Sequence, residues 1–310
     1  AIAFCALSNV LATLFFPYAI LPALVYGAIF YYFRSKAVVQ RNRLIFFWFL
    51  AVLGFVAALL LESFYGPVII YNLVYSPTIS YFQGFSSATA MGFLSAALLE
   101  EFQKFWMASI AALVAHPWFG SDSPWTTMVL GSFATLVVAT VENCEYTMKM
   151  GSIFPLFFQT SLRDISSVPL HMTTGIFIST CIAFIRFHPR FRGDFGTVWL
   201  FGPVILIFPI MIHGAYDFAL MLMGGIFFVY PEASSAWGLL ALVPVICVIV
   251  GYIVQIICIM QVRKLQAAFE SQQAQLTTVE AMTLEDNSLG VDHSFDSLDA
   301  KSAVFSLNTL

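Results

Sequence analysis

Charged residues are scarce in this chain: aspartate, glutamate, lysine and arginine together make up only 10% of its 310 residues. Hydrophobic residues make up 60%, and the mean hydropathy is +0.88, which is well outside the range of soluble globular domains. The formal net charge is −4, and this acidic balance argues against a nucleic-acid partner. The composition therefore predicts a multi-pass integral membrane protein embedded in a lipid bilayer.

Several motifs that often reveal a function are missing. The five cysteines form no CxxC or Cys/His pattern, so the sequence indicates neither disulfides nor a thiolate metal site. There is no internal repeat, no phosphate-binding glycine loop and no HExxH motif, which would place two histidines on one helix. A metal site in this chain would have to draw its ligands from separate segments.

Long hydrophobic segments predict an all-α bundle of about seven transmembrane helices, since about 20 helical residues cross the hydrocarbon core of a bilayer. The segment 66–82 is apolar but short, and Pro67 and Pro77 interrupt it. We interpret it as a re-entrant or interfacial piece, with an eighth span as the alternative. The predicted spans are residues 9–33, 44–61, 85–115, 125–148, 168–187, 197–223 and 237–262.

Basic residues orient the predicted bundle. Clusters of lysine and arginine follow the first, fifth and last spans, and all three clusters fall on one side of the membrane. By the positive-inside rule that side is cytoplasmic. The N-terminus and the loops 62–84, 149–167 and 224–236 are then expected on the opposite face.

The composition changes after the last predicted span. Residues 265–283 could extend the last helix, but the remainder is acidic and rich in serine, aspartate and asparagine, which is typical of a disordered tail. We therefore predict a membrane domain at residues 1–264, with a motif core at 85–223. Residues 265–310 are predicted to form an acidic, mostly disordered cytoplasmic tail.

Four of the predicted spans contain ionisable residues, although each one costs about 2.5 to 3.5 kcal/mol at the centre of a membrane. Residues four apart share one face of an α-helix, and each of these spans has a pair of residues at that spacing. Because lipid cannot solvate polar stripes, we expect the four stripes to face one another. The pairs are Glu100 and Lys104, Glu142 and Tyr146, His171 and Gly175, and His213 and Asp217.

Carboxylates and imidazoles that share one pocket have the chemistry of a hydrolase. Both groups are ligands that zinc accepts in proteins. A further glutamate can take a proton from a free or metal-bound water.

Four short motifs carry these residues along the chain: EEFQK, ENCEY, RDISSVPLH and HGAYDF. In order and spacing they resemble the motifs of the PrsW family, which comprises polytopic intramembrane proteases grouped as metalloproteases. The family is similar in motif plan to the CAAX prenyl endoproteases. The resemblance covers residues 85–223 and implies an intramembrane endopeptidase whose substrate is a membrane protein or a membrane-anchored peptide.

The resemblance also implies roles for the site residues. Glu100 would be the general base, with Glu101 as its electrostatic partner and Lys104 tuning the pair. Zinc is the implied cofactor, with His171, His213, Glu142 and Asp217 as its candidate ligands. The implied catalytic residues are Glu100, Glu101, Lys104, Glu142, Asn143, His171, His213 and Asp217, and Arg163 and Pro169 complete the third motif.

The last motif departs from the pattern of the similar prenyl endoproteases. They have an asparagine where this chain has Asp217, and that asparagine helps to hold the oxyanion. An aspartate cannot donate an amide hydrogen bond, so we expect Asp217 to bind metal or to orient His213.

Other functions remain open on the same residues. Chains of Glu, His and Asp in a helix bundle are also typical of proton-coupled transporters, although this chain has no repeated halves. The polar groups could instead lock the helices of a non-catalytic membrane scaffold together. The sequence also does not discriminate between a zinc enzyme and a metal-free glutamate protease.

Overall fold

The computed structural model describes residues 20–32, 85–86, 88–119, 123–149, 161–191, 195–229 and 234–288. All the secondary structure in these ranges is helical, which confirms the predicted all-α class. One element, η1, is a π-helix, and the others are α-helices. The elements are α2 (Leu21–Tyr32), η1 (Ala90–Ala97), α5 (Leu98–Phe119), α6 (Pro124–Lys149), α8 (Ser167–Phe187), α9 (Phe195–Val229) and α10 (Ser234–Ser288).

Four helical segments among the described residues are long and apolar enough to cross a membrane. Each overlaps one of the last four predicted spans. The predicted span 85–115 corresponds to η1 and α5, which are not among the four segments. Helix α5 carries Glu100, Glu101 and Lys104. The four segments are Pro124–Cys144, Ser161–Phe187, Gly196–Met223 and Leu239–Met282.

The N-terminal predictions are covered only in part. Helix α2 lies inside the predicted first span, 9–33. The predicted span 44–61 and the predicted re-entrant segment 66–82 lie outside the described residues. The total of about seven spans therefore stays a prediction.

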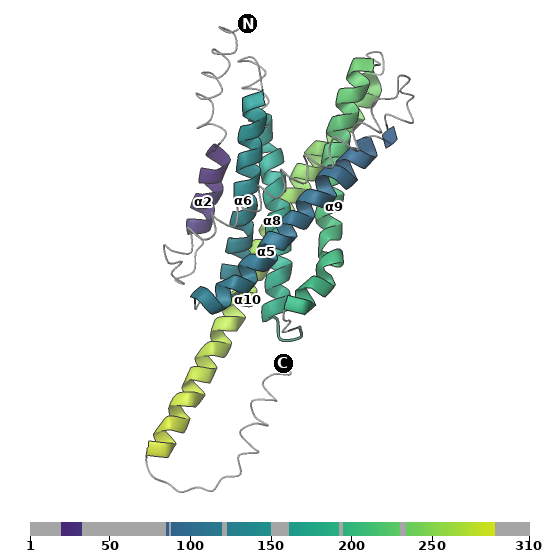
Figure 1. Ribbon diagram of the computed structural model, residues 1–310. Helices are drawn as coiled ribbons and strands as arrows, with labels where there is room; N and C mark the ends of the chain where they lie inside the picture. Colours follow the sequence, from purple (N-terminus) through teal and green to yellow (C-terminus); the bar gives the residue numbers. More distant parts are fainter. Residues whose placement is uncertain are drawn as a thin grey trace.

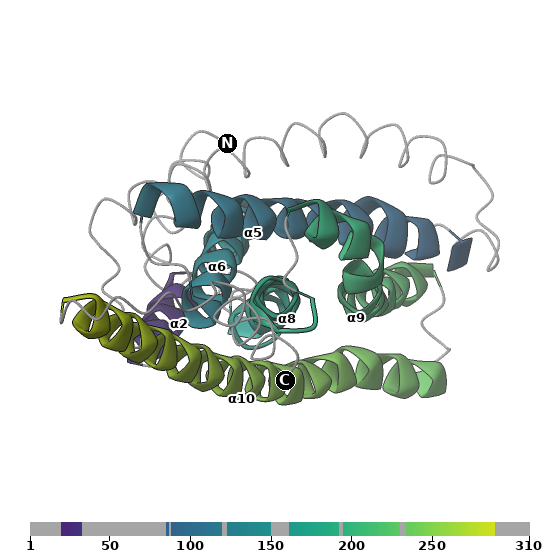
Figure 2. The same cartoon turned by 90° about the horizontal axis from the view of Figure 1, so that it is seen from below.

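The described helices form a layered bundle around α8. In the view of Figure 2, α5 runs along one side and α10 along the opposite side, while α6, α8 and α9 lie between them. Figure 1 shows α5 crossing the bundle diagonally in front of α8. Helix α8 is deeply enclosed, since 16 of its 21 residues are buried. A central helix of this kind can present side chains to several neighbours at once.

Apolar side chains fill both flanks of α8. Met172 and Ile176 belong to a cluster that also includes residues of α6 and α10. Ile178 and Ile182 pack with Phe105 of α5 and with residues of α9. Because lipid tails are as apolar as these side chains, close van der Waals packing holds such helices together in a bilayer.

Helices α6 and α8 approach closely at two glycines. A Cβ atom on Gly131 would lie 2.3 Å from the Ser179 Oγ, and one on Gly175 would lie 2.4 Å from the Thr135 Oγ1. The two contacts are reciprocal, because each helix supplies one glycine and one hydroxyl residue. Small residues at such crossings let helix backbones come together in membranes. This crossing sets the distance between the α6 and α8 residues of the site.

A polar contact ties α10 to the same central helix. The Gln255 side-chain amide donates to the backbone oxygen of Pro169 and to the Thr173 Oγ1, at 2.9 Å each. Pro169 lies in the first turn of α8, where a missing N–H removes no intrahelical hydrogen bond. The motif residue Pro169 therefore helps to begin the helix that carries His171.

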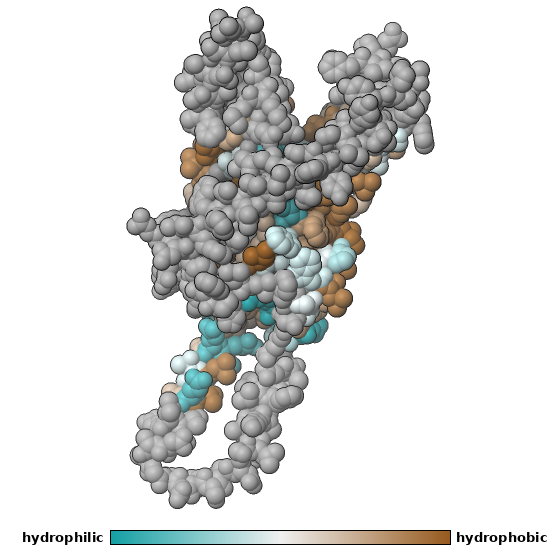
Figure 3. All heavy atoms as spheres, in the orientation of Figure 1, coloured by the Kyte–Doolittle hydropathy of each residue, from teal (hydrophilic) through white to brown (hydrophobic). Residues whose placement is uncertain are grey.

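Helix α10 continues past the predicted membrane span to Ser288, so residues 265–283 do extend the last helix. Its lower part projects from the bundle in Figure 1. Figure 3 shows hydrophilic residues where this part leaves the bundle and hydrophobic residues on the bundle's side. Residues 289–310 lie outside the described residues, so the disorder and the cytoplasmic side of the tail stay predictions.

The α6–α8 crossing predicts that Gly175→Ala destabilises the protein. The added Cβ would lie within 2.6 Å of three side-chain atoms of Thr135, and overpacking of this kind costs about 1 to 3 kcal/mol. The control is Gly27→Ala, whose Cβ would have no neighbour within 4 Å. Thermal unfolding of both variants in detergent measures the difference, and equal melting temperatures would contradict the close contact.

Candidate active site

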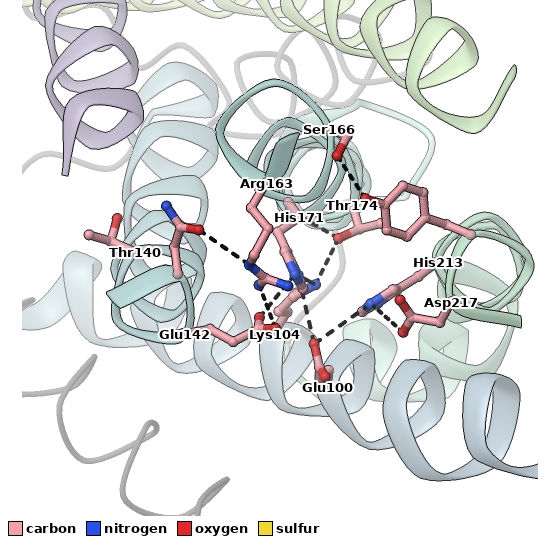
Figure 4. Close-up of polar contacts among 12 residues, drawn as sticks. Glu100, Lys104, Thr140, Glu142, Arg163, Ser166, His171, Thr174, His213 and Asp217 are labelled. Carbon is pink, nitrogen blue, oxygen red and sulfur yellow. Dashed lines mark hydrogen bonds and ion pairs between the residues drawn. The ribbon is translucent and has the colours of Figure 1, made fainter. Parts of the chain in front are cut away.

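The four predicted polar stripes meet in one place. Figure 4 shows Glu100 and Lys104 of α5, Glu142 of α6, His171 of α8 and His213 with Asp217 of α9 arranged around a shared centre. The two imidazole rings lie edge to face, with 4.8 Å between their centroids and 81° between their planes. The expectation that these side chains face one another is therefore met in the structure.

Glu100 stands between the two imidazoles with one carboxylate oxygen unbonded. Its Oε2 lies 3.7 Å from the His171 Nδ1 and 3.8 Å from the His213 Nε2. This oxygen is buried and has no hydrogen-bond partner among the described residues. An unsatisfied buried polar atom is costly and calls for a water, an ion or a function.

Glu101 and Lys104 form a fully buried ion pair behind the two histidines. Lys104 donates to the Glu101 Oε1 at 2.5 Å, and the same oxygen lies 2.7 Å from the His213 Nδ1. The Lys104 Nζ also lies 2.8 Å from the His171 Nδ1 and donates to Thr174 at 3.1 Å. The pair therefore touches both rings. It acts as a support for them, because neither residue is more than 1% exposed.

Glu142 binds the far side of His171. Its Oε2 lies 3.0 Å from the His171 Nε2, and its Oε1 accepts from the Arg163 Nη2 at 2.8 Å. Both carboxylate oxygens are thus engaged. A carboxylate in this position fixes the orientation and the tautomer of an imidazole.

Asn143 belongs to a polar network one step away from the rings. Its amide donates to the Asp164 Oδ1 at 2.7 Å, and its oxygen accepts from the Arg163 Nε at 3.2 Å. Arg163 thereby joins Asn143 to Glu142. The side chain of Tyr146, the last residue of the ENCEY motif, lies outside the described residues.

Asp217 lies beside His213, one helical turn along α9. Its Oδ2 is 3.2 Å from the His213 Nε2, the same nitrogen that faces Glu100. Asp217 is 20% exposed and Glu142 is 22% exposed, whereas His213 is only 4% exposed. Asp217 and Glu142 are therefore the more exposed members of the site, and the two imidazoles lie deeper.

A divalent metal fits the arrangement of donor atoms. Glu100, His171 and His213 each offer one ligand atom, and these atoms lie within 4.8 Å of one another. Tetrahedral zinc with bond lengths of about 2.0 to 2.1 Å requires ligand atoms separated by roughly 3.3 Å, close to the 3.7 and 3.8 Å that separate the Glu100 Oε2 from the two nitrogens. The remaining ring nitrogens contact Glu142 and Glu101, which is the usual carboxylate support of a metal-binding histidine.

This grouping differs from the predicted ligand set of His171, His213, Glu142 and Asp217. Glu100, which we expected to serve as the base, lies among the candidate ligands. Glu142 contacts the nitrogen of His171 that faces away from Glu100, so it orients the ring. A sequence pattern identifies a histidine but not the nitrogen that faces the shared centre, which is why this distinction needed the structure.

The charge of the site also favours a cation. A divalent metal would reduce this excess of negative charge. In the structure the Lys104 ammonium occupies the lone pair of the His171 Nδ1. For a metal to bind this nitrogen, Lys104 would have to give up that contact and keep those with Glu101 and Thr174. The acidic groups of the network outnumber the basic ones: Glu100, Glu101, Glu142, Asp164 and Asp217 face Lys104 and Arg163.

Two further contacts had not been predicted from the motifs. Thr174 follows His171 by three residues on the same helix face and binds Lys104, so helical spacing could have indicated it. The Ser166 Oγ lies 2.7 Å from the Tyr216 hydroxyl and joins the start of α8 to α9. The adjacency of Ser166 and Tyr216 depends on the tertiary fold, and no sequence signal marks it.

Comparison with known proteins gives one match. The model of a family described as PrsW family intramembrane metalloprotease matches residues 40–253, well over half of the chain. The matched range contains every site residue from Glu100 to Asp217. No curated protein and no solved structure matches the chain.

The geometry predicts opposite stability effects for the two neighbouring glutamates. Glu101→Gln should destabilise the protein by about 3 to 5 kcal/mol, because it leaves the Lys104 ammonium buried without a counter-charge. Glu100→Gln should leave stability unchanged or raise it, because the Glu100 Oε2 makes no hydrogen bond to any described residue and stands 3.7 and 3.8 Å from the two ring nitrogens. Chemical or thermal unfolding of both variants measures the contrast, and equal losses would show that Glu100 is also a structural anchor.

Proposed function

Because the chain belongs to the PrsW family of intramembrane metalloproteases, we propose that it is an endopeptidase that hydrolyses membrane-protein substrates with a water activated by Glu100. The observation that carries this proposal is the Glu100 Oε2, which is buried between two imidazoles and makes no hydrogen bond within the described part of the chain. The Glu101 Oε2 and the Asp164 Oδ2 also lack a partner among the described residues, so what sets the Glu100 oxygen apart is its position 3.7 and 3.8 Å from nitrogens of both imidazole rings.

Glu100 is the proton acceptor of the proposed reaction. A water bound at its Oε2 would lie next to the His171 Nδ1 and the His213 Nε2, from which the acceptor is 3.7 and 3.8 Å away. Such a water can lose its proton to the carboxylate as it attacks the carbonyl carbon of a peptide bond, and general-base catalysis requires a direct hydrogen bond of this kind. Glu100 then returns the proton to the leaving amine.

Zinc is the metal that we propose for this site, held by His171, His213 and Glu100. When bound there, zinc would polarise the peptide carbonyl and lower the pKa of water. The carboxylate of Glu100 has two oxygens with about four lone-pair sites. Ligation through Oε2, the oxygen that faces both ring nitrogens, would leave Oε1 to accept the proton in the zinc-bound enzyme, whereas Oε2 is the acceptor when no metal is bound.

The surrounding residues position the two imidazoles. Glu142 holds the Nε2 of His171 at 3.0 Å, and Glu101 holds the Nδ1 of His213 at 2.7 Å. These contacts leave the opposite nitrogens directed at Glu100. Lys104 keeps Glu101 charged and in place. The Asp217 Oδ2 lies 3.2 Å from the His213 Nε2 and accepts its hydrogen bond while no zinc is bound. Zinc bound to that nitrogen would replace this hydrogen bond, because a metal-bound ring nitrogen carries no proton.

The proposed substrate is a membrane protein cut within the bilayer or just outside it. A transmembrane peptide must unwind before its carbonyls can be attacked, because all of its backbone groups are bonded within the helix. His171 lies in the second turn of α8, and His213 lies in the second half of α9. With the orientation that the basic clusters predict, cleavage would take place towards the non-cytoplasmic face.

Glu100→Gln should abolish cleavage while leaving protein abundance unchanged. Loss of a general base costs about 10²- to 10⁴-fold in rate, and the amide keeps the shape of the side chain. Comparative proteomics of membrane-protein fragments in cells that express wild type or Glu100→Gln would identify substrates. Cleavage of such a substrate by the purified protein in liposomes then gives the rate.

A matched control for this test is Glu270→Gln, which changes an exposed glutamate on the projecting part of α10. It should cleave at the wild-type rate. Fragment patterns that are identical in wild type and Glu100→Gln would refute the protease proposal. A proton-coupled flux in liposomes that is lost with Asp217→Asn would support the transporter instead.

Metal removal gives an independent result. We expect purified wild type to contain about one zinc ion per chain, and His171→Ala and His213→Ala each to lose it. Elemental analysis measures the content, and chelator treatment followed by zinc addition should remove and restore cleavage. Full activity of a metal-free preparation would reject the zinc assignment and leave Glu100 acting with the two imidazoles alone.

A further inference from the structure

Two glycines outside the cluster of reacting groups form the contact between η1 and α9. A Cβ on Gly92 of η1 would lie 2.8 Å from the backbone nitrogen of Phe218 and 3.1 Å from the backbone oxygen of Gly214. A Cβ on Gly214 of α9 would lie 2.3 Å from the Phe93 ring. The two backbones are therefore as close as glycine permits, and any side-chain carbon at either position would force them apart or displace Phe93.

The crossing adjoins the site along both chains. Gly214 directly follows His213, and Phe218 directly follows Asp217. On the other helix, η1 runs without a break into α5, which begins at Leu98 and carries Glu100 and Glu101. A shift of the two backbones at the glycines would be transmitted to the carboxylates on one side and to His213 on the other, because packed helices move as rigid elements.

The unusual form of η1 adds to this argument. It is a π-helix over Ala90–Ala97, followed directly by the α-helical turn that bears both glutamates. π-helical hydrogen bonds run from residue i to i+5, so such a segment changes the angle at which the flanking residues face their neighbours. π-helices are rare in proteins, and those that occur are often found at functional sites. Gly92 within it is the residue that touches the α9 backbone.

We propose that Gly92 and Gly214 are positioning residues that hold Glu100 and Glu101 at working distance from His213. The distances at stake are 2.7 Å between the Glu101 Oε1 and the His213 Nδ1, and 3.8 Å between the Glu100 Oε2 and the His213 Nε2. The inference rests on the proposed function. A displacement of about 1 Å in such a constellation lowers turnover about 100-fold.

The other glycines of the chain provide matched controls. Gly202 is also on α9, but a Cβ there would meet only the Phe105 ring, at 3.0 Å or more, and a ring can yield by a few tenths of an ångström. Gly27 of α2 has no neighbour within 4 Å of its Cβ position. Alanine at either position changes the helix preference of the chain in the same way as alanine at Gly214, without touching the crossing.

The experiment compares kcat and KM for cleavage of one substrate in liposomes. Gly214→Ala should lower kcat about 100-fold with KM nearly unchanged, while Gly202→Ala and Gly27→Ala keep the wild-type values. Adding Phe93→Ala to Gly214→Ala should restore kcat to that of Phe93→Ala alone, because the truncation makes room for the new methyl group. If Gly214→Ala does not fold, the double variant carries the test by itself.

Gly92 behaves differently, because the atoms that its Cβ would meet belong to the backbone. Gly92→Ala should lose kcat in the same way, and Phe218→Ala should not rescue it. Rescue at Gly214 without rescue at Gly92 separates a defined contact from general loss of stability. A folded double variant that stays inactive while Phe93→Ala is active would overturn the proposal.

Cobalt(II) binding, measured by its visible absorption, is a second readout that does not require cleavage. Gly214→Ala should bind cobalt about 10- to 100-fold more weakly than wild type, as when a supporting residue of a metal site is lost, and Gly202→Ala should bind as wild type does. If wild type cleaves and Gly214→Ala cleaves and binds equally well, the inference fails and the proposed function stands. If wild type neither cleaves nor binds cobalt, the proposed function fails and takes the inference with it.

Discussion

The organising constraint of this protein is that lipid cannot solvate charge. Each carboxylate or imidazole that the chain places in an apolar helix must find a partner inside the bundle, and the cost of failing is several kcal/mol per group. Four helices carry such groups, so the four must meet, and α8 is the helix around which they do. The remaining packing follows: glycines bring α6 against α8, and Gln255 ties α10 to the first turn of the same helix.

Within the resulting cluster, the partners are distributed unevenly, and this asymmetry is the basis for the assigned chemistry. Glu101, Lys104 and Glu142 use their side chains to hold the two histidines. Glu100 keeps one oxygen without a partner at the point where both rings converge. The Glu101 Oε2 and the Asp164 Oδ2 are also unpaired in the described structure, but the Glu100 oxygen is the one that lies 3.7 and 3.8 Å from the two ring nitrogens that face the shared centre. In the function that we propose, this oxygen receives the proton of the attacking water.

Much of this arrangement could be predicted from residue spacing. Long hydrophobic segments predicted helices, and residues four apart predicted polar stripes that had to converge. The finer geometry could not be predicted, because it depends on contacts between distant segments. Asp164 binds Asn143 of α6, Ser166 contacts the Tyr216 hydroxyl of α9, and Glu142 supports His171 on the side away from Glu100. A π-helix has no signature in hydropathy, so η1 and its glycine contact with α9 were also invisible.

The central claim is that a single reactive position lies between Glu100, His171 and His213. An experimental structure of the wild-type protein in lipid nanodiscs, at a resolution that separates water from metal, tests this claim directly. The account predicts an ordered metal ion or water within about 3 Å of the Glu100 carboxylate and of both imidazoles. Finding that the Lys104 ammonium fills this position, or that Glu100 turns towards lipid, would contradict it.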